Sequence, residues 1–178
     1  MRGVRPLALA GAAVSLVVLE RRLAEAAAAG RRDVTTVVTG VRIRAPRERA
    51  WAELADLEDQ PRWMHDAKRI RVLTPGPPGV GTRAEADVRI LGVGVLDPVV
   101  VTAWEPPSRF AIAHVGRFAG AGEITLADEG GTATEVTWRE TLRAPLLPHV
   151  GGLLLGPLLR RVFQADLERL RDLVEAGA

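Results

Sequence analysis

Hydrophobic and polar residues alternate along most of the chain between residues 34 and 143, a period typical of β-strands whose two faces meet different surroundings. In the first such segment, 34–44, we expect the face that carries Val37, Thr39, Val41 and Ile43 to be buried. Further strands are predicted over the segments 68–73, 82–90, 95–104, 110–115, 122–126 and 134–143.

Charged residues occupy one face of the segment 82–90, where Arg83, Glu85, Asp87 and Arg89 alternate with apolar residues. This even split predicts an antiparallel sheet with one face in water. The turns between strands are rich in glycine and proline, which is typical of hairpins and short loops. The turn positions that we identify are the stretch 74–81, Gly92 or Gly94, 105–108 and 130–131.

Pro98 follows Asp97 inside an otherwise apolar strand, 95–104. Because proline has no N–H to donate to a neighbouring strand, this position predicts an edge strand or a bulge.

Helical spacing recurs in two regions. Between Pro46 and Pro61 the spacing of Ala50, Leu54 and Leu57 predicts a short helix, and a second helical turn is expected around residues 63–65. From residue 156 to the end, one apolar stripe predicts a long helix that packs on the sheet. Its members are Leu159, Val162, Phe163, Leu167, Leu170 and Val174. The preceding segment, 146–155, contains Pro148 and a Gly-Gly pair, so we expect it to be bent and to act as a hinge or a flap.

The first 32 residues form a separate region, and the domain is predicted to span 33–178. Arg2 and Arg5 precede an apolar stretch, 6–19, which ends at a charged segment; roughly 20 residues are needed to span a bilayer. Three interpretations remain open: an uncleaved short anchor that holds the domain at the cytoplasmic face of the membrane, a cleaved signal peptide, and a soluble or surface-lying helix or a misassigned start. The anchor is favoured because basic residues such as Arg31 and Arg32 follow the apolar stretch.

Composition excludes several enzyme classes. The chain of 178 residues has no cysteine and no tyrosine, so thiolate catalysis, disulfides and zinc–thiolate sites are absent. Ser15 and Ser108 lie outside any nucleophile elbow, and the three histidines are too dispersed for a recognisable metal motif. We predict no cofactor and no metal. The net charge of +2 comes from scattered arginines, which argues against a nucleic acid partner.

From residue 34 to the end the chain resembles the SRPBCC superfamily, also known as START-like or Bet v 1-like proteins, in particular its polyketide cyclase/dehydrase-like branch. The resemblance lies in the order of the elements and in short motifs: Trp63, Gly79-Val80-Gly81-Thr82, the turn from Trp104 to Phe110, and the strand from Gly131 to Trp138. It implies an α+β helix-grip fold, in which a curved antiparallel sheet wraps a long C-terminal helix around a mostly apolar cavity. Members bind lipids, sterols, quinones or polyketides, and some act on them as enzymes.

If the face of the last strand that carries Trp138 is the concave one, ten residues are candidates for lining that cavity: Trp63, Trp104, Ile112, His114, Val136, Trp138, Glu140, Leu142, Leu159 and Phe163. Glu140 is the best candidate for a polar group there, although a carboxylate near the mouth, solvated or paired with an arginine, is the more common situation. His114 shares parity with Ile112, and a lone strand histidine is more often structural than a base. The adjacency of His65 and Asp66 is weak evidence for a site. No catalytic residue is identified.

Three functions are compatible with this pattern. The favoured one is the binding of a lipophilic small molecule or lipid, for storage, transport or sensing, by a membrane-associated domain. The second is a cyclase or dehydratase that uses Glu140 or His114 for acid/base chemistry. The third is a protein-interaction or stress-response module.

Overall fold

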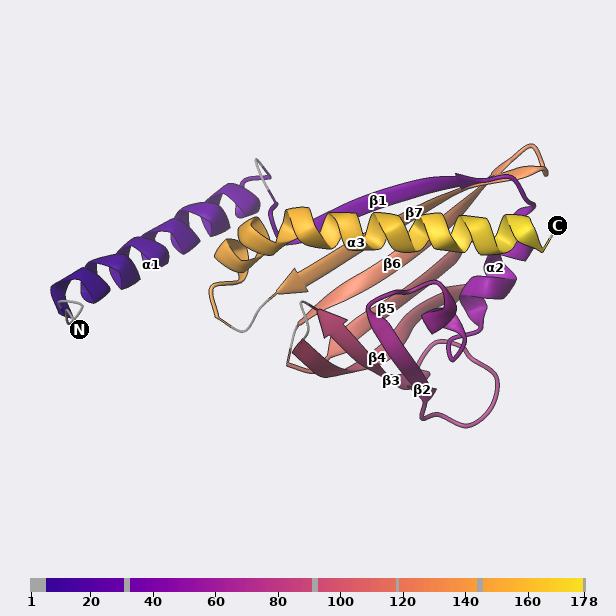
Figure 1. Ribbon diagram of the computed structural model, residues 1–178, viewed down its shortest axis with the longest axis horizontal. Helices are drawn as coiled ribbons and strands as arrows, with labels where there is room; N and C mark the ends of the chain where they lie inside the picture. Colours follow the sequence, from indigo (N-terminus) through magenta and orange to yellow (C-terminus); the bar gives the residue numbers. More distant parts are fainter. Residues whose placement is uncertain (1–5, 31–32, 91–92, 118, 144–145, 178) are drawn as a thin grey trace.

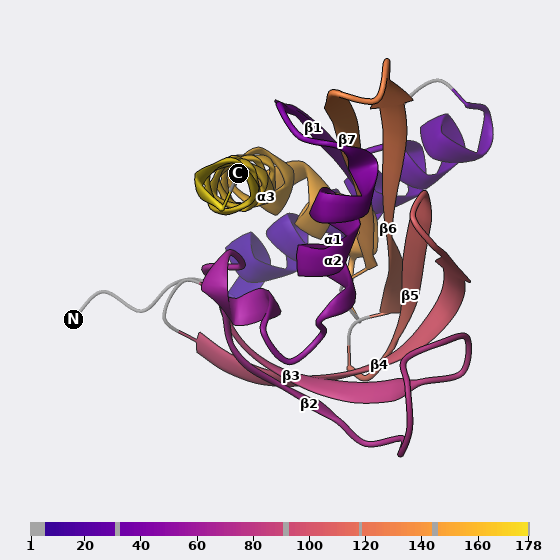
Figure 2. The same cartoon turned by 90° about the vertical axis from the view of Figure 1, so that its right-hand side faces the viewer.

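The computed structural model describes residues 6–30, 33–90, 93–117, 119–143 and 146–177. Within these ranges seven strands form one antiparallel sheet in the order β1-β7-β6-β5-β4-β3-β2, and this curled sheet wraps around a long C-terminal helix (Figures 1 and 2). The predicted α+β helix-grip fold is confirmed. The elements are α1 (Pro6–Ala28), β1 (Thr36–Ile43), α2 (Arg47–Ala55), the 3₁₀ turn η1 (Gln60–Arg62), β2 (Ala67–Val72), β3 (Arg83–Ile90), β4 (Val93–Glu105), β5 (Arg109–Val115), β6 (Ala119–Glu129), β7 (Ala133–Arg143) and α3 (Pro148–Ala176).

The core lies between the concave face of the sheet and α3. The face of β1 that was predicted to be buried is buried, and so is the alternate set on β7 that includes Val136 and Trp138. The apolar stripe of α3 packs against them, and each fully buried Leu or Phe contributes about 1.5–3 kcal/mol. The buried members of the stripe are Leu159, Phe163, Leu167, Leu170 and Val174.

Helix α3 begins earlier than the sequence pattern predicted. The expected hinge or flap over 146–155 is instead mostly helix, because the left-handed conformation of Leu147 (φ 51°) turns the chain directly into the first turn at Pro148. Pro157 lies inside the helix, where its missing N–H leaves the carbonyl of Leu153 without its helical donor. Despite this missing bond, α3 is one continuous helix, and it runs alongside β1 and β7 (Figure 1).

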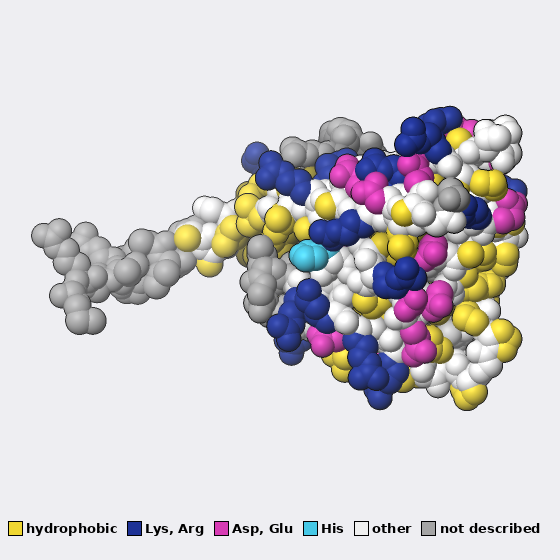
Figure 3. Space-filling view, turned by 45° about the vertical axis from the view of Figure 1, so that its right-hand side comes forward, with side chains coloured by type: hydrophobic (Ala, Val, Ile, Leu, Met, Phe, Trp, Pro, Cys, Tyr) yellow, Lys and Arg dark blue, Asp and Glu magenta, His cyan; other side chains and the backbone are white. Residues whose placement is uncertain are grey.

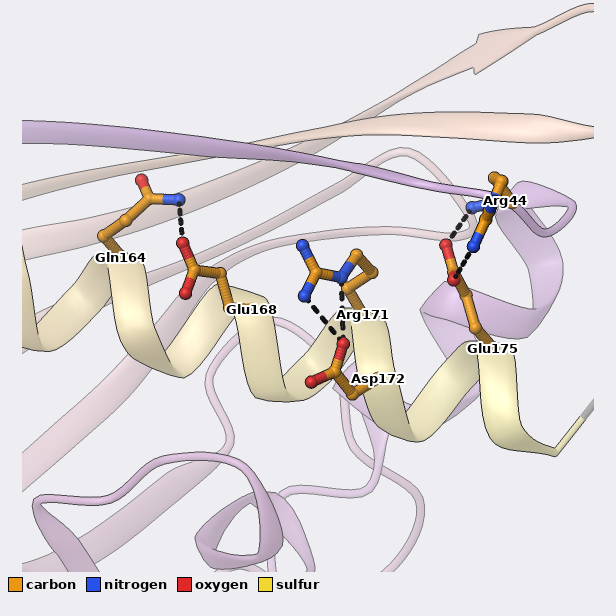
Figure 4. Close-up of polar contacts among 6 residues, drawn as sticks. All are labelled: Arg44, Gln164, Glu168, Arg171, Asp172 and Glu175. Atoms are coloured by element: carbon orange, nitrogen blue, oxygen red, sulfur yellow. Dashed lines mark hydrogen bonds and ion pairs between the residues drawn. The ribbon is translucent and has the colours of Figure 1, made fainter.

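Polar side chains of α3 cover the open edge of the sheet at β1. Arg160 donates to the carbonyl of Val38 at 2.8 Å, and Gln164 donates to that of Gly40 at 3.2 Å. At the far end Glu175 accepts hydrogen bonds from the backbone N–H and the guanidinium of Arg44 (Figure 4). The contacts of Arg160 and Gln164 occupy carbonyls of the edge strand, and that of Glu175 occupies an N–H just beyond its end, so these groups are not free to pair with another chain.

Strand β4 lies between β3 and β5, so it is an interior strand of the sheet. However, its register with β5 begins at Val99 opposite His114, and the segment 93–98 extends beyond that point. Pro98 therefore lies opposite Glu85 of β3 in a stretch of β4 that is locally an edge. The bulge of this strand occurs farther along, between Val101 and Ala103.

Helix α1 projects away from the sheet and meets the rest of the molecule near the start of α3 (Figure 1). The junction includes polar contacts, in which Glu20 accepts hydrogen bonds from the backbone N–H groups of His149 and Val150 and from the His149 ring. Among the described residues, no helix combines the length and the hydropathy needed to cross a membrane. The flanking residues Arg2, Arg5, Arg31 and Arg32, and the predicted hairpin residue Gly92, lie outside the described residues.

Candidate functional site

A cavity of about 340 Å³ lies between the concave face of the sheet and α3. This volume is at the lower end of the range typical of small-molecule sites, about 300–1,000 Å³. Its wall is predominantly apolar and is contributed by η1 and its neighbours, by β2 to β7 and by α3. Residues that line it include Ile70, Ala84, Ala86, Val99, Phe110, Ile124 and Leu155.

Eight of the ten residues predicted to line the cavity do so: Trp63, Ile112, His114, Trp138, Glu140, Leu142, Leu159 and Phe163. The structure places Trp104 and Val136 elsewhere in the core. Trp104 packs edge-on against Trp51 at 5.4 Å between ring centroids, and Val136 is fully buried. Val136 has the predicted parity, but both residues lie toward the end of the sheet where α2 packs and fills the space.

His114 is the centre of a polar cluster that joins three strands. Its Nδ1 lies 2.6 Å from Asp97 Oδ2 on β4, and its Nε2 lies 2.7 Å from Glu140 Oε1 on β7. The Trp138 indole N–H donates to the second oxygen of Glu140 at 2.9 Å. The three ionisable side chains are 10%, 15% and 5% exposed for His114, Asp97 and Glu140, so they interact with little screening by water.

Gly122 makes this cluster possible. Strand β6 lies between β5, which carries His114, and β7, which carries Glu140, and Gly122 is opposite Glu140 in the register. A Cβ atom on residue 122 would lie 2.6 Å from Glu140 Oε2 and 3.3 Å from Ile112 Cγ1. The glycine therefore leaves the space through which the carboxylate reaches His114.

The two carboxylates hold His114 in its charged form. Burial alone would lower its pKa, but the hydrogen bonds from the ring to Asp97 and Glu140 raise the pKa to about 10. At neutral pH both ring nitrogens therefore donate. The expectation that Glu140 is solvated at the mouth or paired with an arginine is wrong: it is buried and bonded to His114 and Trp138.

A second group of polar side chains belongs to residues that line the cavity and, unlike the His114 cluster, has atoms without a hydrogen-bond partner. Within the described part of the chain, Trp63 Nε1 and Asp66 Oδ1 are buried without a hydrogen-bond partner. Burial raises the pKa of Asp66, and the nearby charge of Glu140 raises it further. Behind it, burial raises the pKa of Asp166 to about 6, although Asp166 Oδ1 accepts a hydrogen bond from the His65 backbone N–H at 2.9 Å.

Sequence reasoning missed Asp97, Asp66 and Asp166 as members of these groups. Asp97 had a signal, because it is an acid inside a strand that is otherwise apolar. Of the adjacent pair His65 and Asp66, the aspartate lines the cavity whereas the histidine is exposed. Within the described residues, no group of three or more histidine and acidic side chains is arranged to hold a metal ion.

Comparisons with solved structures agree with this fold. A protein of Thermus thermophilus is 22% identical with a TM-score of 0.67, over 80% of this chain and 99% of that one. The Zhui aromatase/cyclase of Streptomyces is 18% identical with a TM-score of 0.66, over 79% and 93%. A START superfamily protein of Mycobacterium smegmatis is 18% identical with a TM-score of 0.58, over 80% of this chain and 95% of that one. At these identities the likeness shows the fold alone.

No curated protein matched the sequence. The family described as "Polyketide cyclase / dehydrase and lipid transport" matches residues 34–175, the whole of the sheet and nearly all of α3. Because this match spans well over half of the chain, the protein belongs to that family, the polyketide cyclase-like branch of the SRPBCC superfamily.

Proposed function

We propose that the protein binds a lipophilic small molecule in the cavity between the sheet and α3. The observation that carries this proposal is the cavity itself, about 340 Å³ enclosed by mostly apolar side chains. A ligand that buries about 300 Å² of apolar surface there gains about 7 kcal/mol before the cost of its immobilisation. This gain is enough for specific retention when a few polar contacts fix the orientation.

The geometry of His114 supports binding over catalysis. A general base needs a free nitrogen lone pair close to neutral pH, whereas both ring nitrogens of His114 are occupied by carboxylates. The cluster is thus a fixed part of the wall whose hydrogen bonds are already made, and His114 is not available to take a proton from a bound molecule.

The test compares the wild type with a variant whose cavity is filled. Ala86 is a small lining residue of β3, so Ala86→Phe places a ring in the cavity without removing an existing contact. Thr102→Phe, on the exposed face of β4, is the matched control. Each protein is purified without detergent, its organic extract is analysed by mass spectrometry, and binding of the neutral dye Nile red is measured. We expect ligand and dye in the wild type and in Thr102→Phe and neither in Ala86→Phe; equal behaviour of all three would refute the proposal.

A second function is supported by Asp66. Its carboxyl lines the cavity, has an oxygen without a partner and has a raised pKa, properties of a general acid that acts on a bound substrate. A cyclase or dehydratase of this kind would lose turnover in Asp66→Asn while it retains substrate binding. If a substrate is found and the variant turns it over at the wild-type rate, this second function is excluded.

We also propose that α1 brings the domain to a membrane surface. Its residues Val14 and 16–19 are exposed apolar side chains, and hydrophobic side chains gather where α1 meets the domain (Figure 3). These side chains lie on several sides of the helix, so α1 presents apolar surface that can enter the lipid interface. We expect the full chain to float with phosphatidylcholine vesicles in a density gradient and the double variant V17E/V18E to remain in the soluble fraction. Equal flotation of the two proteins would contradict a role for α1.

A further inference from the structure

The cavity wall is acidic in a protein that is rich in arginine. The chain has 24 basic and 22 acidic residues, yet among the described residues no arginine or lysine lines the cavity. The ionisable side chains that do line it are Asp66, Asp97, His114 and Glu140. Three of these four are carboxyl groups, so the wall has an excess of negative charge.

His114 does not offset that excess toward a ligand. Both of its ring N–H groups donate to carboxylates of the wall, and the cluster of one imidazolium with two carboxylates carries a net charge of −1. An incoming carboxylate or phosphate would find no free charged donor and would face Asp97 and Glu140 across a poorly screened interior.

Two residues that line the cavity, Trp63 and Asp66, have buried side-chain atoms without a partner, and a ligand that reaches them by displacing the surrounding side chains supplies the missing bonds. Asp66 Oδ1 is a buried acceptor without a donor, and Trp63 Nε1 is a buried donor without an acceptor, in a side chain that is only 1% exposed. A buried polar atom without a partner has lost its bond to water and gains most when a ligand supplies one. A hydroxyl group provides both a donor and an acceptor, and an amine provides a donor to Asp66.

We infer that the cavity selects lipophiles whose polar end is a hydroxyl or an amine, and that it excludes those ending in a carboxylate or a phosphate. This inference rests on the proposed function, because it names the class of ligand for the same cavity. In this inference Asp66 accepts a hydrogen bond from the hydroxyl or amine, whereas Asp97 and Glu140 repel a carboxylate or phosphate.

The experiment uses three ligands of equal chain length on the full protein: 1-decanol, decylamine and decanoate, each measured by isothermal calorimetry at pH 7.5 and by displacement of bound Nile red. We expect the dissociation constants of the alcohol and the amine to be at least tenfold lower than that of decanoate. In Asp66→Asn the dissociation constant of the amine should rise more than that of the alcohol, because only the amine is a cation, and thermal unfolding checks that the variant folds.

A second variant tests the same idea by gain of binding. Met64 lines the cavity and is similar in length to lysine, so Met64→Lys adds a cation to the wall and is expected to tighten decanoate binding at least tenfold. Thr102→Lys on the exposed face is the control and should leave the ranking unchanged.

The outcomes separate the two proposals. If Nile red binds and decanoate competes as well as decanol, or if neither the alcohol nor the amine displaces the dye, the inference about ligand class is overturned while the proposed function stands. If neither the dye nor any of the three ligands binds, the proposed function itself fails.

Discussion

The cavity contains two polar regions that differ in how their hydrogen bonds are completed. In the cluster of Asp97, His114 and Glu140, each side chain has a partner within the wall, and Trp138 supplies a further bond to Glu140. In the neighbouring pair of Trp63 and Asp66, one donor and one acceptor are buried without any partner in the described part of the chain.

The difference separates a structural role from a binding role. A satisfied cluster gains nothing from a ligand, but its loss leaves buried charge behind, so its effects appear in the free energy of unfolding. An unsatisfied pair reduces stability until a ligand completes it, so its effects appear in affinity. The following predictions test this division, beginning with the largest expected effect.

Replacement of His114 by alanine removes the cation between two buried carboxylates. We expect the free energy of unfolding to fall by about 3–5 kcal/mol, as is typical when one partner of a buried ion pair is deleted. Urea denaturation at pH 7 measures this change. Asp66→Ala serves as the comparison and should cost less; if the two variants are equally destabilised, the two regions do not differ in the proposed way.

Alkaline pH should remove the charge of His114 reversibly and so lower the free energy of unfolding, as the substitution does. The folded-state pKa of His114 is about 10 against an ordinary value of 6.5, so its stabilisation is fully present below pH 6.5 and is lost as the pH rises through 10. The loss amounts to roughly 4 kcal/mol. Few other side chains titrate in this range, because the chain has no cysteine or tyrosine and a single lysine, Lys68. Denaturation midpoints recorded from pH 7 to 11 should decline in the wild type and stay nearly flat in His114→Ala.

The space that Gly122 provides predicts a steric defect of intermediate size. In Gly122→Ala the new methyl group would collide with Glu140 Oε2 at 2.6 Å, and displacement of the carboxylate should cost about 2 kcal/mol of stability. Gly94 on β4 is the matched control, since a Cβ there meets no atom within 4 Å. Thermal unfolding should separate the two variants by several degrees. Similar melting temperatures would mean that Glu140 reaches His114 by another route.

Asp166→Asn is expected to change the free energy of unfolding least and, unlike the other variants, to increase it. Burial raises the pKa of Asp166 from 3.8 to about 6, so the carboxyl stabilises the fold most at low pH, and this contribution disappears as the pH rises through 6. The uncharged amide should therefore raise stability at pH 8 by about 1–2 kcal/mol and change little at pH 4. Urea denaturation at the two pH values measures it. A loss of stability at pH 8 would show that the bonds from Arg169 and from the His65 backbone N–H outweigh the cost of burying the charged carboxylate.

The sequence predicted the faces of the strands but not the contacts between them. Because the side-chain period of a strand is two, Trp138, Glu140 and Leu142 were correctly placed on one face, and the apolar stripe of α3 was identified in the same way. The bond between His114 and Glu140 depends instead on the register of β5, β6 and β7 and on a missing side chain at Gly122. Neither is encoded in local periodicity. The start of α3 was missed for a similar reason, since proline and glycine usually indicate an interruption, whereas here Pro148 occupies the first turn.

The contact between Glu20 and the first turn of α3 determines which form of the protein is suitable for ligand measurements. Glu20 accepts hydrogen bonds from the backbone N–H groups of His149 and Val150, which lie in the first turn of α3. The next residues of this helix, including Gly151, Gly152 and Leu155, form part of the cavity wall. A truncated protein that starts at residue 33 would keep every strand and all of α3, but it would lack the carboxylate that caps this helix beside the cavity. In such a fragment the first turn of α3 would be less ordered, and so would the part of the cavity wall that it forms. Affinities should therefore be measured on the full-length chain.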